Sequence, residues 1–319
     1  MKYDLVFEGG GAKGMVFVGA MQVFEAQGHT HGRLLGTSAG AITAALLAAG
    51  YSSLEMLDAL AEKKDGHSVF SGFLGPVQAF DKTAIRSSAI RQLLRKINLS
   101  FIPDAIEDRL DDQLAEWLAT EPTLRHIFSF VERGGWFAAD NFVAWLGRRL
   151  DTGTYNGEPR RFNGLTLAQF YAATNVDLSL IAADTVAGQM LVLNHRTAPD
   201  LPLVWAVRMS MSIPLLWQEV VWQAEWGLYN GNEMTGHTIV DGGLLSNFPI
   251  ELFVSRDKTV TRVMGPIVSD HVLGMMIDES MPVRGAETPA PAPTKFNLGE
   301  LRTVQRLANL MNTTLSARD

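Results

Sequence analysis

Residues 33–50 read RLLGTSAGAITAALLAAG, a segment that puts Ser38 between Gly36 and Gly40 in a G-x-S-x-G pattern. An apolar run precedes this pattern, and a run of small apolar residues follows it. The segment therefore predicts a buried strand, a sharp turn and a helix, the context in which a serine hydroxyl is exposed as a nucleophile. The flanking glycines leave room for the close packing that such a turn requires. The alternative is a serine that only caps the helix in a glycine-rich turn.

The first fifty residues repeat one pattern twice. The apolar run Leu5–Phe7 predicts a strand, and the spacing of apolar residues predicts a helix over Met15–Gln27. A second strand over Arg33–Gly36 and a second helix over Ala41–Ala49 follow. This order is typical of a parallel sheet joined by right-handed crossovers, so the sequence predicts an α/β fold.

A glycine-rich loop joins the first predicted strand to the first predicted helix. It consists of Gly9, Gly10, Gly11, Ala12, Lys13 and Gly14. Consecutive glycines expose backbone N–H groups that can converge on an anion. A P-loop is excluded, because it needs Gly-Lys followed by Ser or Thr, and here Gly14 and Met15 follow the lysine.

Two anion-binding interpretations of this loop remain, beside a purely structural turn. Gly9, Gly11 and Gly14 satisfy the G-x-G-x-x-G of a dinucleotide site, which also wants an acid at the end of the second strand. That position holds Gly36-Thr37-Ser38 instead. The other interpretation is an oxyanion hole beside Ser38, because loops that follow neighbouring parallel strands lie at one edge of the sheet.

A third motif, Asp241-Gly242-Gly243, follows the apolar run Thr238–Val240, which predicts a strand. A carboxylate at a strand end beside glycines can approach a neighbouring loop closely, and Asp241 can then act as general base to Ser38. Asp-Gly-Gly by itself is also a common turn signal.

No histidine stands out as the third member of a relay. The seven histidines are His29, His31, His67, His126, His195, His237 and His271. In α/β-hydrolases the order is serine, acid, histidine, and only His271 follows Asp241. The sequence therefore favours a Ser-Asp dyad.

The composition is that of a globular protein: 319 residues, 47% hydrophobic and 19% charged. The net charge of −7 argues against non-specific nucleic-acid binding and against constant adhesion to anionic lipid. Without cysteine there is neither a disulfide framework nor a thiolate zinc site. Neither a signal peptide nor a transmembrane run is evident, so we expect a cytoplasmic protein, with secretion by a leaderless route left open.

The rest of the chain predicts a helical insertion and an appended helix. Apolar spacing indicates four helices between residue 54 and about 160, over Leu54–Glu62, Thr83–Lys96, Pro103–Ala119 and Ala139–Leu150. Later segments predict strands at Phe170–Ala173, Met190–Leu193 and Val272–Ile277 and a helix at Leu203–Met211. We therefore expect a catalytic domain over 1–284, with an insertion or cap at about 54–160. A Pro/Ala linker and a helix at Leu298–Thr313 would follow in 285–319.

The ordered motifs GGGAKG (9–14), GTSAG (36–40) and DGG (241–243) resemble the patatin-like phospholipase family. The segments at 172–177, 207–214 and 244–249 look similar to that family as well, so the resemblance covers residues 3 to about 280. It implies a three-layer α/β/α sandwich around a mostly parallel sheet. It also implies lipid acyl hydrolysis by a Ser-Asp dyad, with neither a metal nor another cofactor. Ser38 would attack the ester, Asp241 would take its proton, and the glycine loop would hold the oxyanion.

The expected partner is a phospholipid or other acyl-ester lipid, with peripheral membrane contact and without nucleic acid. Three rival interpretations remain open. In the first, the chain is a nucleotide-dependent oxidoreductase that uses its G-x-G-x-x-G loop. In the second, it is a lipid-binding protein whose catalytic site is inactive. In the third, it is an effector or toxin phospholipase that an unknown partner or ligand activates. The helical insertion would suit a lid or a regulatory surface.

Overall fold

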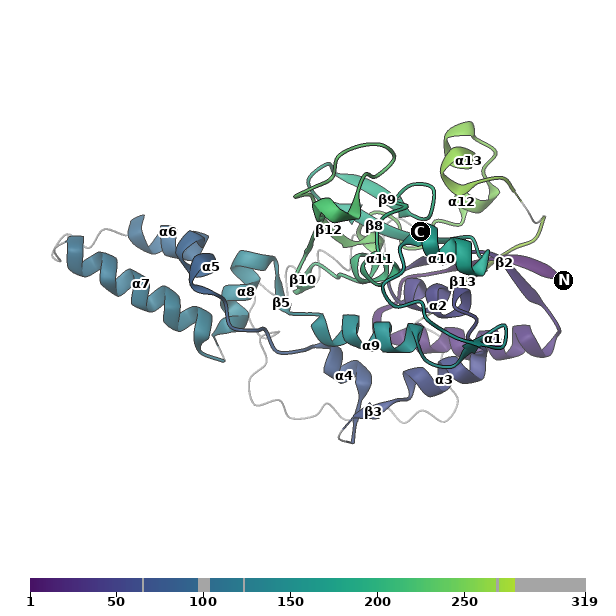
Figure 1. Cartoon of the computed structure of the whole chain (residues 1–319), viewed down its shortest axis with the longest axis horizontal. Coiled ribbons are helices and arrows are strands. Elements are labelled where there is room, and N and C mark those ends of the chain that lie inside the picture. The colour runs from purple at the N-terminus through teal and green to yellow at the C-terminus, as the bar shows by residue number, and fades with distance from the viewer. Residues whose placement is uncertain (65, 97–103, 123, 268–269, 279–319) are drawn as a thin grey trace.

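The protein is described by a computed structural model that covers residues 1–64, 66–96, 104–122, 124–267 and 270–278. Within these residues the core is a seven-stranded sheet with helices on both faces (Figure 1). The predicted linker and C-terminal helix over 285–319 lie outside the described residues. In the part that is described, no helix combines the length and apolar character needed to cross a membrane.

The central sheet is built from a parallel half and an antiparallel half. Strands β13, β1, β2 and β8 are parallel neighbours, whereas β9 and β12 both run antiparallel to β8, and β11 pairs with β12. The strands are β1 (Lys2–Phe7), β2 (Thr30–Thr37), β8 (Leu178–Asp184), β9 (Gln189–Leu193), β11 (Val220–Val221), β12 (Thr238–Asp241) and β13 (Val272–Met275).

Strands β2 and β12 approach each other end to end beside β8. The pairing of β2 with β8 ends at Thr37 opposite Ile181, and the pairing of β12 with β8 ends at Asp241 opposite Ala182. Because β2 and β12 run in opposite directions, their carboxyl ends meet at adjacent positions of β8. The residue after Thr37 must therefore leave the plane of the sheet.

The two faces of the sheet carry separate hydrophobic cores, which gives the three layers of the predicted patatin-like sandwich. Alternate residues point to opposite faces, so Leu5 and Phe7 belong to the larger core and Val6 to the smaller one. The smaller core is covered by α12 (Glu251–Val254) and α13 (Lys258–Met264). The larger core contains residues of α1 (Val16–Ala26), α2 (Ala39–Ala48), α3 (Ser53–Leu60), α9 (Asp140–Leu150), α10 (Leu167–Thr174) and α11 (Leu203–Ser210).

The predictions for the central sheet contain one error and one omission. The segment Phe170–Ala173 was expected to be a strand, but it lies in α10, because Thr166 and Gln169 form a reciprocal capping box that starts a helix. Strand β8 was not predicted, although it is buried along its whole length. The other predicted strands and helices of the core coincide with β1, β2, β9, β12, β13, α1, α2 and α11, with boundaries shifted by a few residues.

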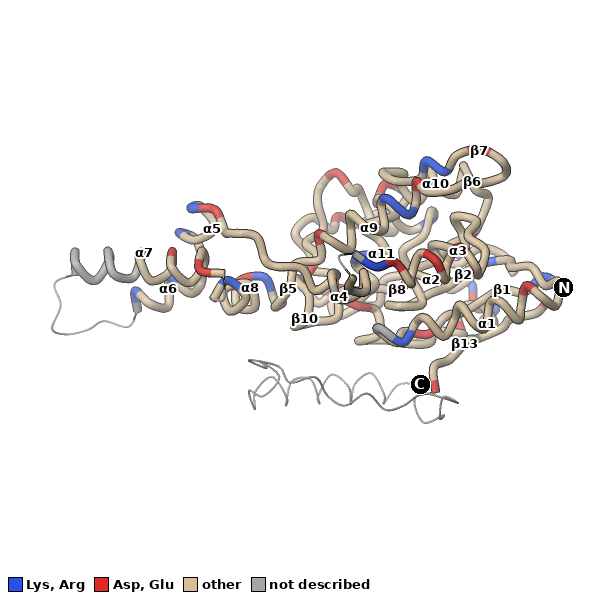
Figure 2. Tube along the Cα trace, turned by 90° about the horizontal axis from the view of Figure 1, so that it is seen from below, with Lys and Arg blue, Asp and Glu red and all other residues tan. Residues whose placement is uncertain are grey.

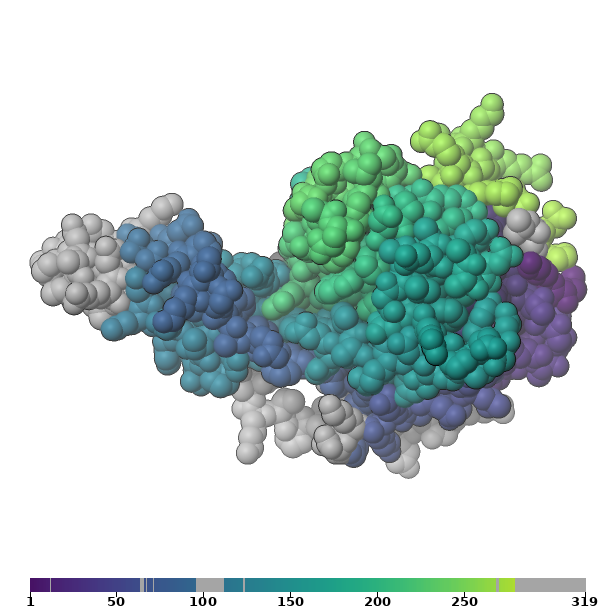
Figure 3. Space-filling view, viewed as in Figure 1, coloured from purple at the N-terminus to yellow at the C-terminus, as the bar shows by residue number. Residues whose placement is uncertain are grey.

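The region between α3 and α9 contains a helical arm that projects from the body of the molecule (Figures 1 and 3). The arm has its own small core of Ile85, Ala115, Ala119 and Phe128. Seen from below, the arm extends from the body in the same direction, and both acidic and basic residues occur along it (Figure 2). Its helices are α5 (Lys82–Ser87), α6 (Ala89–Lys96), α7 (Asp104–Thr120) and α8 (Arg125–Arg133), and α4 (Val69–Phe73) precedes them.

The insertion differs from the expectation of uninterrupted helices. The predicted helix Thr83–Lys96 is divided at Ser88, whose backbone is extended and whose hydroxyl accepts a hydrogen bond from Arg91 N. Strand β5 (Gly135–Phe137) follows α8 and pairs in parallel with β10 (Leu215–Trp217). Two-residue strands also occur, β3 (Lys63–Lys64) with β4 (His67–Ser68) and β6 (Thr154–Tyr155) with β7 (Glu158–Pro159).

A buried ion pair joins β1 to β2 beneath the smaller core. Both Asp4 oxygens accept hydrogen bonds from Arg33, one from the backbone N–H and one from Nε, each at 2.8 Å.

We predict that Asp4→Asn lowers the free energy of unfolding by about 3–5 kcal/mol, because it leaves a buried guanidinium without its counter-charge. Asp112→Asn, which removes a more exposed partner of Arg91, should cost about 0–1 kcal/mol. Chemical denaturation measures both, and equal losses would contradict this account.

Candidate active site

Ser38 lies on the turn between β2 and α2 in an unusual backbone conformation. Its φ is +53° and its ψ is −118°, a combination that costs a non-glycine residue about 1–3 kcal/mol. Only 5% of Ser38 is exposed. Such strain persists only where the surroundings hold it, and it concentrates at functional positions.

The two glycines of the G-x-S-x-G pattern are required by close backbone approach. A Cβ on Gly36 would overlap the backbone of Gly40, and a Cβ on Gly40 would overlap the carbonyl groups of Phe7 and Glu8. The first turn of α2 is therefore packed directly on the end of β1, which brings Ser38 to the loop that follows β1.

The glycine loop lies beside Ser38. A Cβ on Gly9 would be 3.1 Å from Cβ of Ser38, and Gly14 packs against Ala39. Residues Gly11–Met15, with Ala12 and the exposed Lys13 among them, form a short 3-10 helix, η1, that leads into α1. Its first backbone N–H groups have no intrahelical acceptor, which suits them to bind an anion.

A buried carboxylate that sequence reasoning missed holds this loop in place. Glu8 accepts hydrogen bonds from Nδ2 of Asn247 at 3.2 Å and from the N–H of Ile277 at 2.5 Å. The backbone carbonyl of Asn247 also accepts a hydrogen bond from the N–H of Gly9, and its side-chain Nδ2 donates one to the carbonyl of Gly9. A carboxylate immediately after a buried apolar strand was the signal in the sequence, but its partners lie more than 230 residues away.

Asp241 is buried at the end of β12, with one carboxylate oxygen engaged and the other available. Its Oδ1 accepts a hydrogen bond from Gly243 N at 2.8 Å, and its own N–H donates to the carbonyl of Ser212 at 2.9 Å. Its Oδ2 has no hydrogen-bond partner among the described residues. This oxygen is therefore a free acceptor for a proton.

Burial raises the pKa of Asp241 to about 7. The Ser38 hydroxyl and the Gly243 N–H both act in the opposite direction, because they stabilise the ionised carboxylate. A carboxylate with a pKa near neutrality is suited to accept and return a proton at neutral pH.

Ser38 opens into an apolar cavity of about 220 Å³. Its lining combines the glycine loop with segments that precede and follow the helical arm in the sequence. The lining residues are Gly11, Ser38, Ala39, Ile42, Phe70, Phe73, Leu74, Met211, Ile213, Leu216 and Trp217. None of these is charged, so the cavity suits a hydrocarbon chain whose reacting end lies at Ser38.

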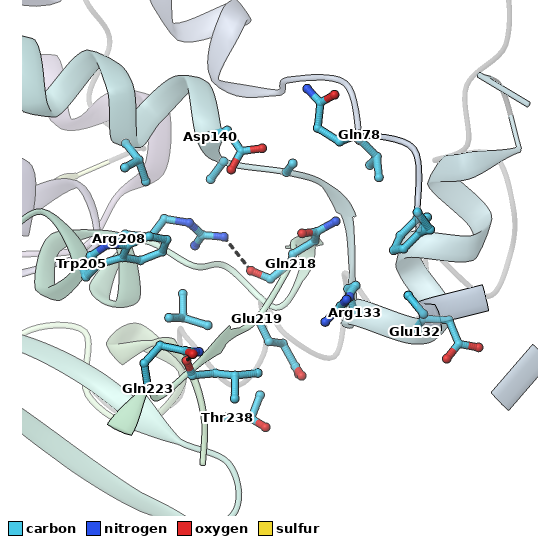
Figure 4. A pocket seen from close by; sticks show the side chains of 18 of the residues that line it. Gln78, Glu132, Arg133, Asp140, Trp205, Arg208, Gln218, Glu219, Gln223 and Thr238 are labelled. Carbon is cyan, nitrogen blue, oxygen red and sulfur yellow. Dashed lines mark hydrogen bonds between the residues drawn. The ribbon is translucent and has the colours of Figure 1, made fainter. Parts of the chain in front are cut away.

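A larger cavity of about 670 Å³ lies elsewhere, where the arm joins the body (Figure 4). It contains neither Ser38 nor Asp241, and its walls carry both acidic and basic side chains, such as Asp140, Arg208 and Glu219. Size alone therefore does not identify the candidate site. We assign the candidate site to the smaller cavity, because the strained Ser38 lines it.

No histidine lines the cavity around Ser38 in the described part of the chain. His237, which is closest in sequence to Asp241, hydrogen-bonds through Nδ1 to Asp184 at 2.8 Å. His271 lies beside Tyr3 at the far end of β1, with their ring centres 5.5 Å apart. The strand pairings bring Ser38 and Asp241 to adjacent ends of β2 and β12 beside β8.

Comparisons with known proteins extend over most of the chain. The family model described as patatin-like phospholipase matches residues 5–254. An uncharacterized protein of Bacillus subtilis, YqhO, is 31% identical over 264 residues, which are 81% of this chain and 69% of that protein.

Two solved structures are also similar. VipD from Legionella pneumophila is 19% identical with a TM-score of 0.43, over 77% of this chain and 47% of that one. ExoU from the type III secretion system of Pseudomonas aeruginosa, solved in complex with SpcU, is 26% identical with a TM-score of 0.33, over 66% and 38%. The chain thus spans less than half the length of these two.

The packing of the elbow predicts a contrast between two glycines. Gly40→Ala should destabilise the protein by about 1–3 kcal/mol or more, because its Cβ meets backbone that cannot move aside. Gly19→Ala should stabilise it by about 0.5–1 kcal/mol, because Gly19 lies in α1 and its Cβ would meet no atom within 4 Å. Thermal unfolding of both variants tests this, and a neutral Gly40→Ala would refute the close approach.

Proposed function

By the family match over residues 5–254, the chain belongs to the patatin-like phospholipase family, and we propose that it is a lipid acyl hydrolase with a Ser38–Asp241 dyad. Its substrate is a phospholipid or another lipid ester whose acyl chain enters the apolar cavity.

One observation carries this proposal. A serine in a strained conformation and a buried aspartate with an unpaired oxygen meet where β2 and β12 end beside β8. The serine supplies a nucleophile, and the aspartate supplies a base whose pKa of about 7 matches neutral conditions. The adjoining apolar cavity supports a hydrocarbon substrate.

In the first step Ser38 Oγ attacks the carbonyl carbon of the ester, and its proton passes to Asp241 Oδ2. The carbonyl oxygen becomes an oxyanion, which the N–H groups at the start of η1 stabilise. The tetrahedral intermediate then collapses, and the bond between the carbonyl carbon and the leaving oxygen breaks. Asp241 returns the proton to this oxygen, so a lysolipid or alcohol departs and Ser38 stays acylated.

In the second step water attacks the acyl carbon while Asp241 takes its proton. The same N–H groups stabilise the second oxyanion. When this intermediate collapses, the ester bond to Ser38 breaks and Oγ recovers the proton from Asp241. The fatty acid is released and the dyad is restored.

Hydrolysis of p-nitrophenyl octanoate tests the dyad. We expect turnover by the wild type, loss to background in Ser38→Ala, and a decrease of about 10²–10⁴ in kcat for Asp241→Asn, since general bases contribute that much. His237→Gln is the matched control and should keep its activity, because His237 pairs with Asp184. A folded but inactive wild type would contradict an autonomous hydrolase, and an active Asp241→Asn would contradict the base.

The raised pKa of Asp241 predicts how the rate depends on pH. Only the ionised carboxylate accepts the serine proton, so kcat/KM should rise with pH and level off above about 7. Rates from pH 5 to 9 measure this, with circular dichroism at each pH to establish that the protein stays folded. A flat profile between pH 5 and 7 would show that Asp241 is not the group that limits the rate.

A further inference from the structure

We propose that the segment 208–212, which includes the end of α11 and the turn after it, positions both members of the dyad, and that Ser210 is a positioning residue for the nucleophile. The inference rests on the proposed function, because Ser210 would act on catalysis only through Ser38. It follows from how the two catalytic residues are bonded to the rest of the fold.

The sheet offers the Ser38 N–H no strand partner. The ladder between β2 and β8 stops at Thr37, and the next position of β8, Ala182, is already paired with Asp241. The N–H of Ser38 instead donates a hydrogen bond to Oγ of Ser210 at 3.0 Å. Ser210 is completely buried, so water cannot replace this acceptor.

The same turn holds Asp241. The carbonyl of Ser212 accepts the N–H of Asp241 at 2.9 Å, so residues two apart on one turn bond the backbones of both catalytic residues. The segment 208–212 therefore constrains the separation of the two catalytic residues in addition to the sheet.

A buried guanidinium anchors this turn from the other side. Arg208 hydrogen-bonds the hydroxyl of Ser212 and, through Nη2, the carbonyl of Gln218 at 2.6 Å (Figure 4). Burial lowers the pKa of Arg208 to about 10, which still leaves it charged at neutral pH. The turn is thus fixed between the dyad and the wall of the larger cavity.

The Ser38 conformation determines where its hydroxyl points. Without the bond to Ser210, the buried N–H must find another acceptor, and the elbow must rotate to reach one. Small displacements of a nucleophile can lower the rate by about 10²-fold. The ground-state binding of the acyl chain, which depends on the cavity walls, should change little.

The test compares Ser210→Ala with Ser179→Ala. Ser179 is an equally buried serine in β8, and its Oγ accepts a hydrogen bond from Asn194 rather than from the dyad. We expect Ser210→Ala to lower kcat by about 10- to 100-fold with KM changed less than about twofold, whereas Ser179→Ala keeps both constants. Ser210→Thr retains a hydroxyl at this position and should recover part of the loss.

Amide hydrogen exchange at Ser38, followed by NMR, gives a readout that needs no turnover. Protection of the Ser38 amide should fall in Ser210→Ala and persist in Ser179→Ala. Unchanged protection, or equal kinetic losses in the two variants, would overturn the positioning role. If the wild type hydrolyses no ester and yet the Ser38 amide loses protection only in Ser210→Ala, the proposed function fails while the positioning of the Ser38 backbone stands.

Discussion

The meeting of β2 and β12 beside β8 is the constraint on which the candidate site depends. Two strands of opposite direction cannot both continue along one edge of a third, so each chain must leave the sheet at the same place. Ser38 turns into α2 there, and Asp241 turns into η3 (Gly242–Leu244). The close backbone packing of Gly36 and Gly40 follows from this abrupt departure, as do the hydrogen bonds that the N–H groups of Ser38 and Asp241 donate to the segment 208–212.

The parts of the site that could be predicted from the sequence are those marked by short local motifs. The strand, turn and helix around Ser38 and the glycine loop after Phe7 lie within the first fifty residues. Because β1 and β2 are parallel neighbours, the loops that follow them lie side by side, and no long-range contact has to be known to predict this. Asp241 was also recognisable, but the antiparallel direction of β12, which brings it to Ser38, was not. The direction depends on which strand β12 pairs with in the folded sheet, and that partner, β8, was not predicted.

The segments that contain Ser210 and Asn247 were noted for their resemblance to the family, but the sequence assigned neither residue a role. Ser210 lies in an ordinary buried helix, and only its contact with Ser38 distinguishes it from Ser179. Strand β8 was missed because its apolar run is short and contains Ser179 and two alanines, which have weak strand propensity. The segment at 170–173 was misassigned because its aromatic residues favour strands, whereas the capping box just before it favours a helix.

The pairing of β5 with β10 gives the helical arm a mechanical connection to the cavity. Strand β10 supplies Leu216 and Trp217 to the cavity wall, and Gln218, which follows it, donates a hydrogen bond from its side chain to Ser129 in α8. A displacement of α8 relative to the body would therefore act on the strand that carries Leu216 and Trp217. The arm is thus mechanically coupled to the apolar wall beside Ser38, which Leu216 and Trp217 help to form.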